Sequence, residues 1–390
     1  MNYKTSHPDK IVKCTIDLPS SKSISNRVLI INSLTGNKLK IQNLSSANDT
    51  IYLQNALKKN GIIDIGHAGT ALRFLTSYLS IQEGKTSILK GSDRIHNRPI
   101  IDLVEALISL GADIKYLDKY GFAPLKIYGK KLKGGKVKIK GDISSQFISS
   151  LLLIAPTLEN GLTINISTNL VSKTYILLTL KLLEKFGINS EWRNNSIRVK
   201  NQQFIFSEEK IEGDWSAASF WYEIAALSQN CEIYLNNLTK NSFQGDMAVK
   251  KIYENFGVKS EFINSSLLLT KKKYNKSNLK NINLINTPDL YQPIKCTLYA
   301  KKIDAVIQGT NNLKYKESSR VKAVDSELRN LNNSRIIQTY EDHRMAMSFA
   351  PLCLKYDDIQ INNIDVVNKS YPNYWKDLKK AGFTIYPVAD

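Results

Sequence analysis

One pattern recurs along the chain: an amphipathic helix ends at Gly or Asn, and a short strand with alternating apolar residues follows at once. Glycine suits that position because the residue after a helix often takes the left-handed conformation. The closing residues are Gly61, Gly111, Gly187, Gly257, Asn333 and Gly382. Their spacings of 50, 76, 70, 76 and 49 residues nearly mirror each other, with three closures in each half. The pattern predicts two domains, each built from three similar α/β units.

Two further segments bear on the domain boundary. The segment 10–18 alternates apolar and polar residues, which predicts a strand that could pair in either half. The motif EGDWSAAS, with Gly213 and Asp214, opens a new helix after a polar stretch, so we place the boundary there.

Composition narrows the class of protein. The chain has 390 residues and is 42% hydrophobic, enough to bury a large core. No opening apolar segment and no apolar run of membrane-spanning length occurs, so we expect neither a signal peptide nor a membrane span. The four cysteines are scattered without CxxC spacing, which favours reduced thiols in a cytoplasm and no metal site.

The formal charge of +19 is compatible with nucleic acid, with acidic small molecules, or with solvated lysines alone. The basic runs lack interleaved aromatic residues, so we expect no nucleic-acid partner. Separately, we expect a monomer that acts on small molecules. A basic, non-catalytic RNA-binding protein of the same α/β architecture remains an alternative, which a salt-dependent gel shift would test.

The first cationic loop is LPSSKSISNR, which runs directly into a helix. Ile24 and Val28 lie on its apolar side, while Lys22, Ser23 and Arg27 gather at the first turn. A helix N-terminus with unpaired N–H groups and two cations suits a phosphate or carboxylate, although a capped helix with solvated cations explains the same residues.

Comparable loops follow in the first half. HAGTALR contains Gly69, which lets a ligand approach the backbone, and NRP holds Arg98 before a helix. The GDISSQF loop places Ser144, Ser145 and Gln146 at the mouth of an apolar helix, with more polar groups than one cap requires. LVSKTY contributes Ser172 and Tyr175.

The second half of the chain contains several loops that are rich in charged residues. Asp289 follows Pro288 between a strand and a helix, and KYKESSR brings Lys316, Glu317 and Arg320 to the opening turn of the next helix. An acid between two cations is either a surface ion-pair set or a proton-transfer group beside an anion site. The EDHRMAM loop places Asp342 as an N-cap before His343 and Arg344, and NKSY holds Lys369 before a C-terminal helix.

Taken together, these motifs resemble those of the 5-enolpyruvylshikimate-3-phosphate synthase family in order and over essentially the whole chain. LPSSKSISNR is similar to the family's LPGSKSxSNR, HAGTALR to NAGTAxR, DRIHNRP to RxxRP, and SSQF to SSQF. LVSKTY is similar to VSKPY, KESSR to KExDR, and EDHRMAM to DHRxAM.

The resemblance implies an α/β fold of two similar domains, each with three βαβαββ units in an inside-out α/β barrel, and a ligand cleft between them. We therefore expect an N-terminal domain over residues 17–212, on the shikimate 3-phosphate side. A C-terminal domain over 213–390, joined by the strand in 1–16, would carry the phosphoenolpyruvate and catalytic groups. The implied reaction transfers an enolpyruvyl group from phosphoenolpyruvate to shikimate 3-phosphate, by addition and elimination, without a cofactor or metal.

The resemblance also implies a role for each matching residue. Lys22, Asp289 and Glu317 would be catalytic: Asp289 accepts the hydrogen bond or the proton of the attacking 5-hydroxyl, Glu317 protonates and later deprotonates the methylene carbon, and Lys22 assists phosphate departure. A carboxylic acid donates near neutral pH only if its proton affinity is raised, so Glu317 is expected to titrate unusually.

The binding residues divide by substrate. Shikimate 3-phosphate would be held by Lys22, Ser23, Arg27, Ser144, Ser145, Gln146, Ser172, Tyr175, Asp289, Asn312 and Lys316. Phosphoenolpyruvate would be held by Lys22, Gly69, Arg98, Gln146, Arg320, Arg344 and Lys369. His67 and His343 are secondary candidates.

Some residues depart from the family pattern, namely Ser20, His67, Phe74, Thr174 and Ser319. The sister enolpyruvyl transferase that acts on UDP-N-acetylglucosamine is the nearest alternative. It typically carries a reactive Cys or Asp in a loop at the phosphoenolpyruvate site, and none of the four cysteines falls between HAGTALR and NRPI.

Overall fold

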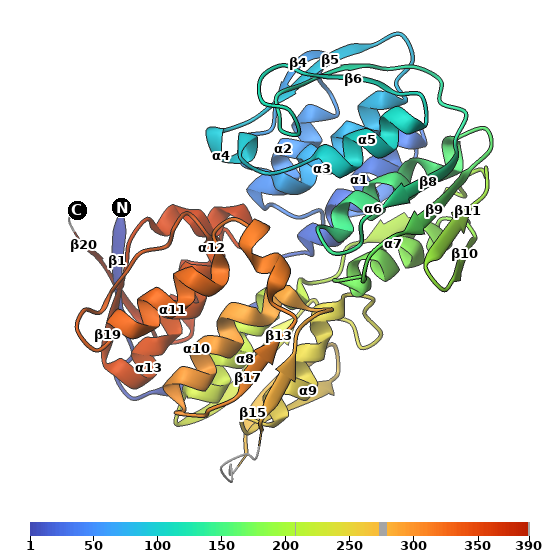
Figure 1. The fold of residues 1–390 in the computed structure, drawn as a ribbon. Coiled ribbons are helices and arrows are strands. Elements are labelled where there is room, and N and C mark those ends of the chain that lie inside the picture. Colours follow the sequence, from blue (N-terminus) through green and yellow to red (C-terminus); the bar gives the residue numbers. More distant parts are fainter. Residues whose placement is uncertain (207, 273–278, 389–390) are drawn as a thin grey trace. The chain divides into compact units, whose positions relative to one another are not determined.

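The computed structural model describes residues 1–206, 208–272 and 279–388. The chain divides into two units: one comprises Met1–Ser21 and Glu212–Asp390, and the other comprises Lys22–Ile211 (Figure 1). We call them the C-terminal unit and the N-terminal unit. Each unit has its own hydrophobic core.

The N-terminal unit is a mixed α/β structure. Its strands are β3 (Lys40–Gln42), β4 (Gly61–Asp64), β5 (Thr86–Lys90), β6 (Asp113–Tyr116), β7 (Leu125–Tyr128), β8 (Gly135–Ile139), β9 (Leu162–Ile166), β10 (Ser190–Arg193), β11 (Ser196–Val199) and β12 (Glu208–Lys210). Its helices are α1 (Lys22–Leu34), α2 (Asn48–Ala56), α3 (Gly69–Ser80), α4 (Asp93–His96), α5 (Ile101–Ser109), α6 (Ser145–Ile154) and α7 (Lys173–Lys185), with a short 3₁₀ turn η1 (Ala155–Thr157).

The C-terminal unit has a matching inventory. Its strands are β1 (Asn2–Ser6), β2 (Ile11–Asp17), β13 (Asn230–Asn236), β14 (Val258–Ile263), β15 (Ser266–Lys271), β16 (Asn281–Asn283), β17 (Val306–Gln308), β18 (Ile336–Ile337), β19 (Asp358–Ile361) and β20 (Thr384–Val388). Its α-helices are α8 (Trp215–Leu227), α9 (Val249–Glu254), α10 (Tyr291–Ala300), α11 (Arg320–Asn330), α12 (His343–Phe349), α13 (Cys353–Tyr356) and α14 (Tyr374–Lys380). Its 3₁₀ turns are η2 (Gly245–Ala248), η3 (Pro288–Leu290), η4 (Asn311–Tyr315), η5 (Ala350–Leu352) and η6 (Ile364–Lys369).

Within the described residues, each unit contains two four-stranded sheets and one two-stranded sheet. The four-stranded sheets have the orders β4-β5-β7-β6, β8-β9-β11-β10, β2-β13-β15-β14 and β18-β19-β1-β20. In each of them the first pair is parallel and the next two pairs are antiparallel. This repetition confirms the expected architecture of similar α/β units.

The two N-terminal strands complete sheets of the C-terminal unit. β2 pairs in parallel with β13, from Ile11 opposite Asn230 to Asp17 opposite Asn236. β1 lies between β19 and β20, the position that β7, β11 and β15 occupy in the other sheets. The strand that could have paired in either half therefore belongs to the C-terminal unit.

The chain passes from one unit to the other at residues 21 and 211. The amide of Ser21 donates to the carbonyl of Glu212 at 2.8 Å, and the amide of Asp214 donates to the carbonyl of Pro19 at 2.8 Å. These bonds, with a bridge between Ser20 and Gly213, hold residues 19–21 in the C-terminal unit, a few residues beyond the expected start at residue 17.

Five of the six expected helix closures have the left-handed backbone that favours glycine. Gly61, Gly111, Gly187, Gly257 and Gly382 have φ between 75° and 98°. The sixth closure, near Asn333, also lies between a helix and a strand, α11 and β18, but Asn333 is not among the residues with positive φ. A turn closes α11 instead: the amides of Asn333 and Ser334 both donate to the carbonyl of Asn330, at 2.9 and 2.8 Å.

Helix α1 is more enclosed than its one apolar side predicts. All residues from 24 to 31 are buried, including Ser25, Asn26 and Arg27. The reason is tertiary, since α2, α3, α6 and α7 all contact α1. The segment 24–31 of α1 is thus enclosed by other helices of the N-terminal unit, while Lys22 and Ser23 at its start are half-buried.

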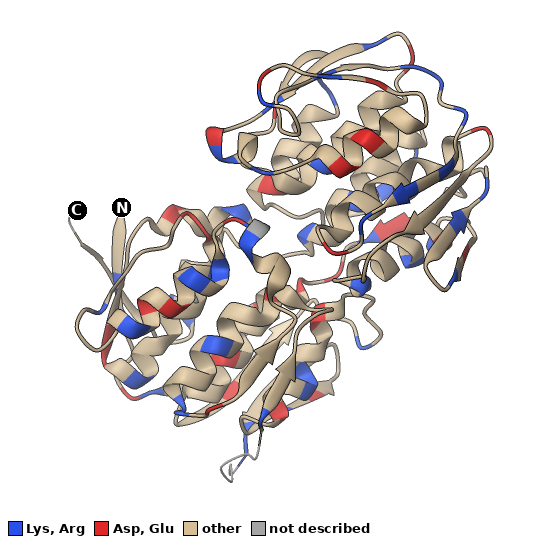
Figure 2. Ribbon diagram, in the orientation of Figure 1, with Lys and Arg blue, Asp and Glu red and all other residues tan. Residues whose placement is uncertain are grey.

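Lys and Arg are distributed over many elements of both units, with Asp and Glu interspersed among them (Figure 2). No helix in the described ranges has the length and hydropathy to cross a membrane.

Candidate functional site

The first cationic loop of the N-terminal unit is arranged around Lys22, the first residue of α1. The ammonium nitrogen of Lys22 lies 3.2 Å from a carboxylate oxygen of Asp49 on α2. Asp49 is almost fully buried, so this ion pair restrains a long side chain that is otherwise costly to order. Sequence analysis did not identify Asp49, because nothing local relates it to a residue 27 positions earlier.

Arg27 is buried, and its guanidinium donates hydrogen bonds to four other residues. Its guanidinium donates to the carbonyl of Ser23 at 2.7 Å and to the carbonyl of Tyr175 at 3.2 Å. It also donates to the hydroxyls of Thr179 at 2.7 Å and Ser149 at 3.3 Å. Burial lowers the pKa of Arg27 to about 10, with the Tyr175 hydroxyl opposing the shift, so the group remains cationic at neutral pH. Arg27 therefore ties the start of α1 to the start of α7.

The Gly69 loop supports an arginine pair. A methyl group at Gly69 would lie 2.2 Å from Nη1 of Arg98 and 2.8 Å from Nη1 of Arg73. Arg73 in turn donates to the carbonyl of Gly69 at 2.8 Å. Only a residue without a side chain permits this approach, which explains why glycine stands there. Sequence analysis noted Arg73 one turn into the helix but did not include it among the site residues.

The SSQ motif joins this loop. Ser144 caps α6 by accepting a hydrogen bond from the amide of Gln146, and Ser145 is buried at the first helical position. The side-chain amide of Gln146 donates to the hydroxyl of Thr70 at 3.3 Å. Gln146 is thereby brought next to Gly69, although the two are 77 residues apart in sequence.

Ser172 is positioned by its local backbone, and His67 is positioned by the packing of its ring. Ser172 precedes α7 in the left-handed conformation, with φ of 57°, which is uncommon for a serine and typical of functional loops. His67 packs edge-on against Tyr52, with ring centroids 5.7 Å apart.

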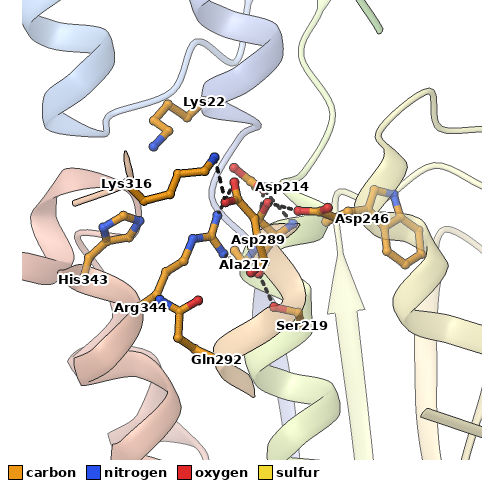
Figure 3. Close-up of polar contacts among 12 residues, drawn as sticks. Lys22, Asp214, Ala217, Ser219, Asp246, Asp289, Gln292, Lys316, His343 and Arg344 are labelled. Atoms are coloured by element: carbon orange, nitrogen blue, oxygen red, sulfur yellow. Dashed lines mark hydrogen bonds and ion pairs between the residues drawn. The ribbon is translucent and has the colours of Figure 1, made fainter. Parts of the chain in front are cut away.

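In the C-terminal unit, Asp289 on η3 lies among three cations, of which Lys316 and Arg344 are labelled in Figure 3. Its carboxylate is 2.8 Å from Arg320, 3.0 Å from Arg344 and 3.5 Å from Lys316. Burial alone would raise the pKa of Asp289, but the charges of Arg344, Lys316 and Arg320 outweigh it and hold that pKa well below its usual value. Asp289 is consequently ionised across the physiological range.

Arg320 connects three acids. It is 1% exposed, and its separate nitrogens lie 2.9 Å from Asp342, 2.8 Å from Asp289 and 2.8 Å from Glu317. Burial would lower the pKa of Arg320, but the three carboxylates reverse the effect and raise it. Because the guanidinium is planar, it fixes the positions of the three carboxylates relative to one another. Sequence analysis recognised Asp342 as an N-cap only; the structure gives it this second contact.

The remaining candidates of this unit border the same network. Lys369, at the end of η6, lies 3.9 Å from the other oxygen of Glu317. His343 begins α12, with Nδ1 3.6 Å from Asp342. Asn312 is buried within η4, just before Lys316. Asp342 caps α12 by accepting from the amide of Arg344 at 3.0 Å, as the sequence predicts.

This arrangement is chemically suited to an anion. Lys316, Arg320, Arg344 and Lys369 are held by Asp289, Glu317 and Asp342, with little of any of these charges exposed to water. An anionic ligand with oxygen atoms in similar positions could compete with the carboxylates for the same donors. Among the described residues, no group of three or more His, Cys, Asp or Glu could hold a metal ion.

Comparison with known proteins matches the sequence to one family. The profile of the family "EPSP synthase (3-phosphoshikimate 1-carboxyvinyltransferase)" matches residues 53–378. A 3-phosphoshikimate 1-carboxyvinyltransferase of Bacteroides fragilis (strain YCH46) is 42% identical over 408 aligned residues, covering 99% of each chain. One of Haemophilus influenzae (strain PittGG) is 34% identical and covers 97% of this chain and 99% of its own length.

The fold is similar to that of a solved EPSP synthase from Acinetobacter baumannii. The TM-score is 0.77 at 19% sequence identity, over 99% of this chain and all of the other. At that identity the likeness concerns the fold.

The ion pairs of Asp289 lead to a pH-dependent prediction. Because the folded-state pKa of Asp289 is lowered, its stabilisation is complete above the unfolded value near 3.8 and is lost as the pH falls through the folded value. We expect Asp289→Asn to reduce the free energy of unfolding by about 3 kcal/mol at pH 7, with the loss shrinking below pH about 4. Denaturant titration at several pH values measures this.

Asp325→Asn is the matched control, since Asp325 forms a more exposed pair with Lys295 at 3.7 Å. Its effect is expected to stay within about 0.5 kcal/mol. An Asp289→Asn deficit that persisted unchanged at low pH would contradict the assignment of the stabilisation to this carboxylate.

Proposed function

The chain belongs to the EPSP synthase family, and from that membership we propose how its own residues bind the two substrates and divide the reaction. The enzyme transfers the enolpyruvyl group of phosphoenolpyruvate to the 5-hydroxyl of shikimate 3-phosphate and releases phosphate, a step of aromatic amino acid biosynthesis. The observation that carries this conclusion is 42% identity over 99% of both chains. Neither the UDP-N-acetylglucosamine reaction nor an RNA-binding role is favoured by these relatives.

Shikimate 3-phosphate is proposed to bind at the polar groups gathered at the helix starts of the N-terminal unit. Its ligands there are Lys22, Ser23, Arg27, Ser144, Ser145, Gln146, Ser172 and Tyr175. Support comes from Arg27, which bonds the carbonyls of both Ser23 and Tyr175 and so holds two of these helix starts at a fixed separation. Helix N-termini and cations together suit a phosphate. Asp289, Asn312 and Lys316 of the C-terminal unit are proposed as further ligands.

Phosphoenolpyruvate is proposed to bind the remaining cations. Its ligands are Lys22, Gly69, Arg98, Gln146, Arg320, Arg344 and Lys369. The position of the Arg98 guanidinium against Gly69 supports this, because Gly69 begins α3 and a cation beside a helix N-terminus suits an anion. In the C-terminal unit, the ion pairs of Arg344 and Lys369 with acids keep these cations in place until an anion competes for them.

Proton transfer is proposed to use Asp289 and Glu317. Asp289 is kept ionised by its three cations, which suits a group that accepts the hydrogen bond of the attacking hydroxyl, while the same cations make it a weaker base for taking the proton. Glu317 adds a proton to the methylene carbon and later removes it, while Lys22 assists the departing phosphate. Both carboxylates bind Arg320 at 2.8 Å, so a single buried group holds the two at a constant spacing.

We further propose that the enzyme is a cytoplasmic monomer that acts on small molecules and does not bind nucleic acid. The reaction as proposed requires no metal and no organic cofactor. His67 and His343 stay secondary candidates, since their ring contacts are with Tyr52 and Asp342.

A direct assay tests the activity. We expect phosphate release when the protein is given shikimate 3-phosphate with phosphoenolpyruvate, and none when UDP-N-acetylglucosamine replaces shikimate 3-phosphate. Phosphate release with UDP-N-acetylglucosamine and phosphoenolpyruvate, but not with shikimate 3-phosphate and phosphoenolpyruvate, would identify the sister reaction instead. An electrophoretic shift of RNA that weakens with salt, without phosphate release, would favour the nucleic-acid alternative.

The role of Glu317 leads to a second prediction. Glu317→Ala removes the proposed proton donor, so turnover should fall by roughly two to four orders of magnitude, while both substrates still bind. Stopped assays for turnover and equilibrium titration for binding measure the two effects separately. Glu254→Ala, at an exposed position of α9, is the control and should leave turnover unchanged. A Glu317→Ala enzyme that kept most of its rate would refute the assignment.

A third prediction concerns the Gly69 and Arg98 contact. Arg98→Ala deletes a charged donor, and Gly69→Ala pushes the Arg98 guanidinium away, since the new methyl group would lie 2.2 Å from Nη1. Both variants should raise the KM for phosphoenolpyruvate, by about tenfold or more for Arg98→Ala. Arg193→Ala is the control, because this arginine lies on β10 with its side chain 85% exposed. Equal KM values in all three variants would count against Arg98 as a ligand.

A further inference from the structure

Asp246, on the short turn η2, is a buried carboxylate that the reaction as described above does not use. One of its oxygens accepts a hydrogen bond from the hydroxyl of Ser216 on α8. Its other oxygen, Oδ1, is buried and has no hydrogen-bond partner among the residues that the structure describes. Burying a carboxylate oxygen without a hydrogen-bond partner costs free energy, so the charge state of Asp246 depends strongly on the groups around it.

The position of Asp246 is fixed by its neighbour in sequence, Gln244. The side-chain oxygen of Gln244 accepts from the amide of Trp215 at 3.1 Å, and its side-chain nitrogen donates to the carbonyl of Gly213 at 2.8 Å. The amide of Met247 donates to the carbonyl of Gln244 at 3.1 Å. These bonds attach η2, which carries Asp246, to the start of α8.

The groups that face Asp246 come from several elements. They are Asp289 on η3, Arg344 on α12, Asp214 at the N-cap of α8, and Ser216 in its first turn. Figure 3 shows the Asp246 carboxylate beside those of Asp289 and Asp214. Asp289 and Arg344 are themselves an ion pair at 3.0 Å. A second buried carboxylate thus lies next to the ion pair that an anionic substrate has to loosen.

We propose that Asp246 is a positioning residue for phosphoenolpyruvate, because its charge sets how tightly Arg344 is retained by the carboxylates of the enzyme. This inference rests on the proposed function, since it takes Arg344 as a ligand of phosphoenolpyruvate. When ionised, Asp246 joins Asp289 in attracting Arg344 and adds negative charge where an anion has to bind. When protonated, it leaves Arg344 to Asp289 alone, and the anion binds more readily.

The ionisation of Asp246 falls in a useful range. Burial and the neighbouring charge of Asp289 raise its pKa to about 6, with Asp214 adding to the rise and with Arg344 and Ser216 opposing it. An anion that competes for Arg344 weakens one of the two opposing effects. Binding of the anion therefore favours the protonated form of Asp246, and by reciprocity protonation favours binding.

The test compares Asp246→Asn with the wild-type enzyme. The KM for phosphoenolpyruvate is measured from pH 5.5 to 8.5 at saturating shikimate 3-phosphate, by phosphate release. We expect the variant to have a KM about five- to tenfold lower than wild type above pH 7 and a nearly equal KM at pH 5.5. The ligand's own ionisation is common to both proteins and cancels in their ratio.

A second variant keeps the carboxylate and changes only its hydrogen bond. Ser216→Ala removes a contact that lowers the pKa of Asp246, so the midpoint of the pH dependence should move to higher pH. Asp377→Asn is the matched control: this carboxylate is also buried, accepts from Tyr371 at 2.9 Å and belongs to the same unit. Its KM ratio to wild type should stay constant with pH.

Results that contradict the role of Asp246 can be told apart from results that contradict the proposed function. A KM ratio for Asp246→Asn that does not change with pH, or a Ser216→Ala midpoint that stays in place or moves to lower pH, would overturn the role of Asp246 while leaving the reaction intact. An absence of phosphate release by the wild-type enzyme would instead overturn the proposed function itself.

Discussion

The buried guanidinium of Arg320 is the constraint on which the C-terminal unit's site depends. An unpaired charge in a protein interior is costly, so Arg320 can be buried only with carboxylates around it. Asp289, Glu317 and Asp342 meet that need from separate segments, each within 2.9 Å. The same contacts that neutralise the arginine place two proposed proton-transfer groups at a fixed distance, and Asp342 also caps the helix that carries Arg344.

The N-terminal unit solves a similar problem with backbone groups. Arg27 is buried among carbonyl and hydroxyl oxygens rather than carboxylates, so its positive charge is solvated without being neutralised. Arg98 rests against a glycine, where any side chain would displace it. This unit therefore presents cations with fewer acids, and the other presents cations already paired with acids. The difference suits the roles proposed for them, since proton transfer needs carboxylates and anchoring a phosphate does not.

Both arrangements use the repeated sheet plan. Every four-stranded sheet has one parallel pair followed by two antiparallel pairs, and short loops after its strands lead into helix starts. Polar residues at those starts recur because a helix N-terminus has unpaired N–H groups that must be satisfied by caps or ligands. Repetition of the plan accordingly yields several anion-compatible loops from one structural rule. The strands β1 and β2 complete the rule in the C-terminal unit, since two of its four-stranded sheets would otherwise each lack a strand.

Sequence by itself determined the number and kind of units, the start of α1 at Lys22, the N-caps Ser144 and Asp342, and most of the glycine closures, because these follow from local periodicity and capping. It also identified the charged residues of the KESSR and DHR loops. Only the tertiary structure decided which charges meet: Lys22 with Asp49, Arg320 with three acids, and Asp246 with Asp289. These partners lie in different segments of the chain, and no local pattern relates them. Burial was likewise decided by the tertiary structure. Arg27 is enclosed because four other helices surround α1, and the sequence of α1 does not indicate this.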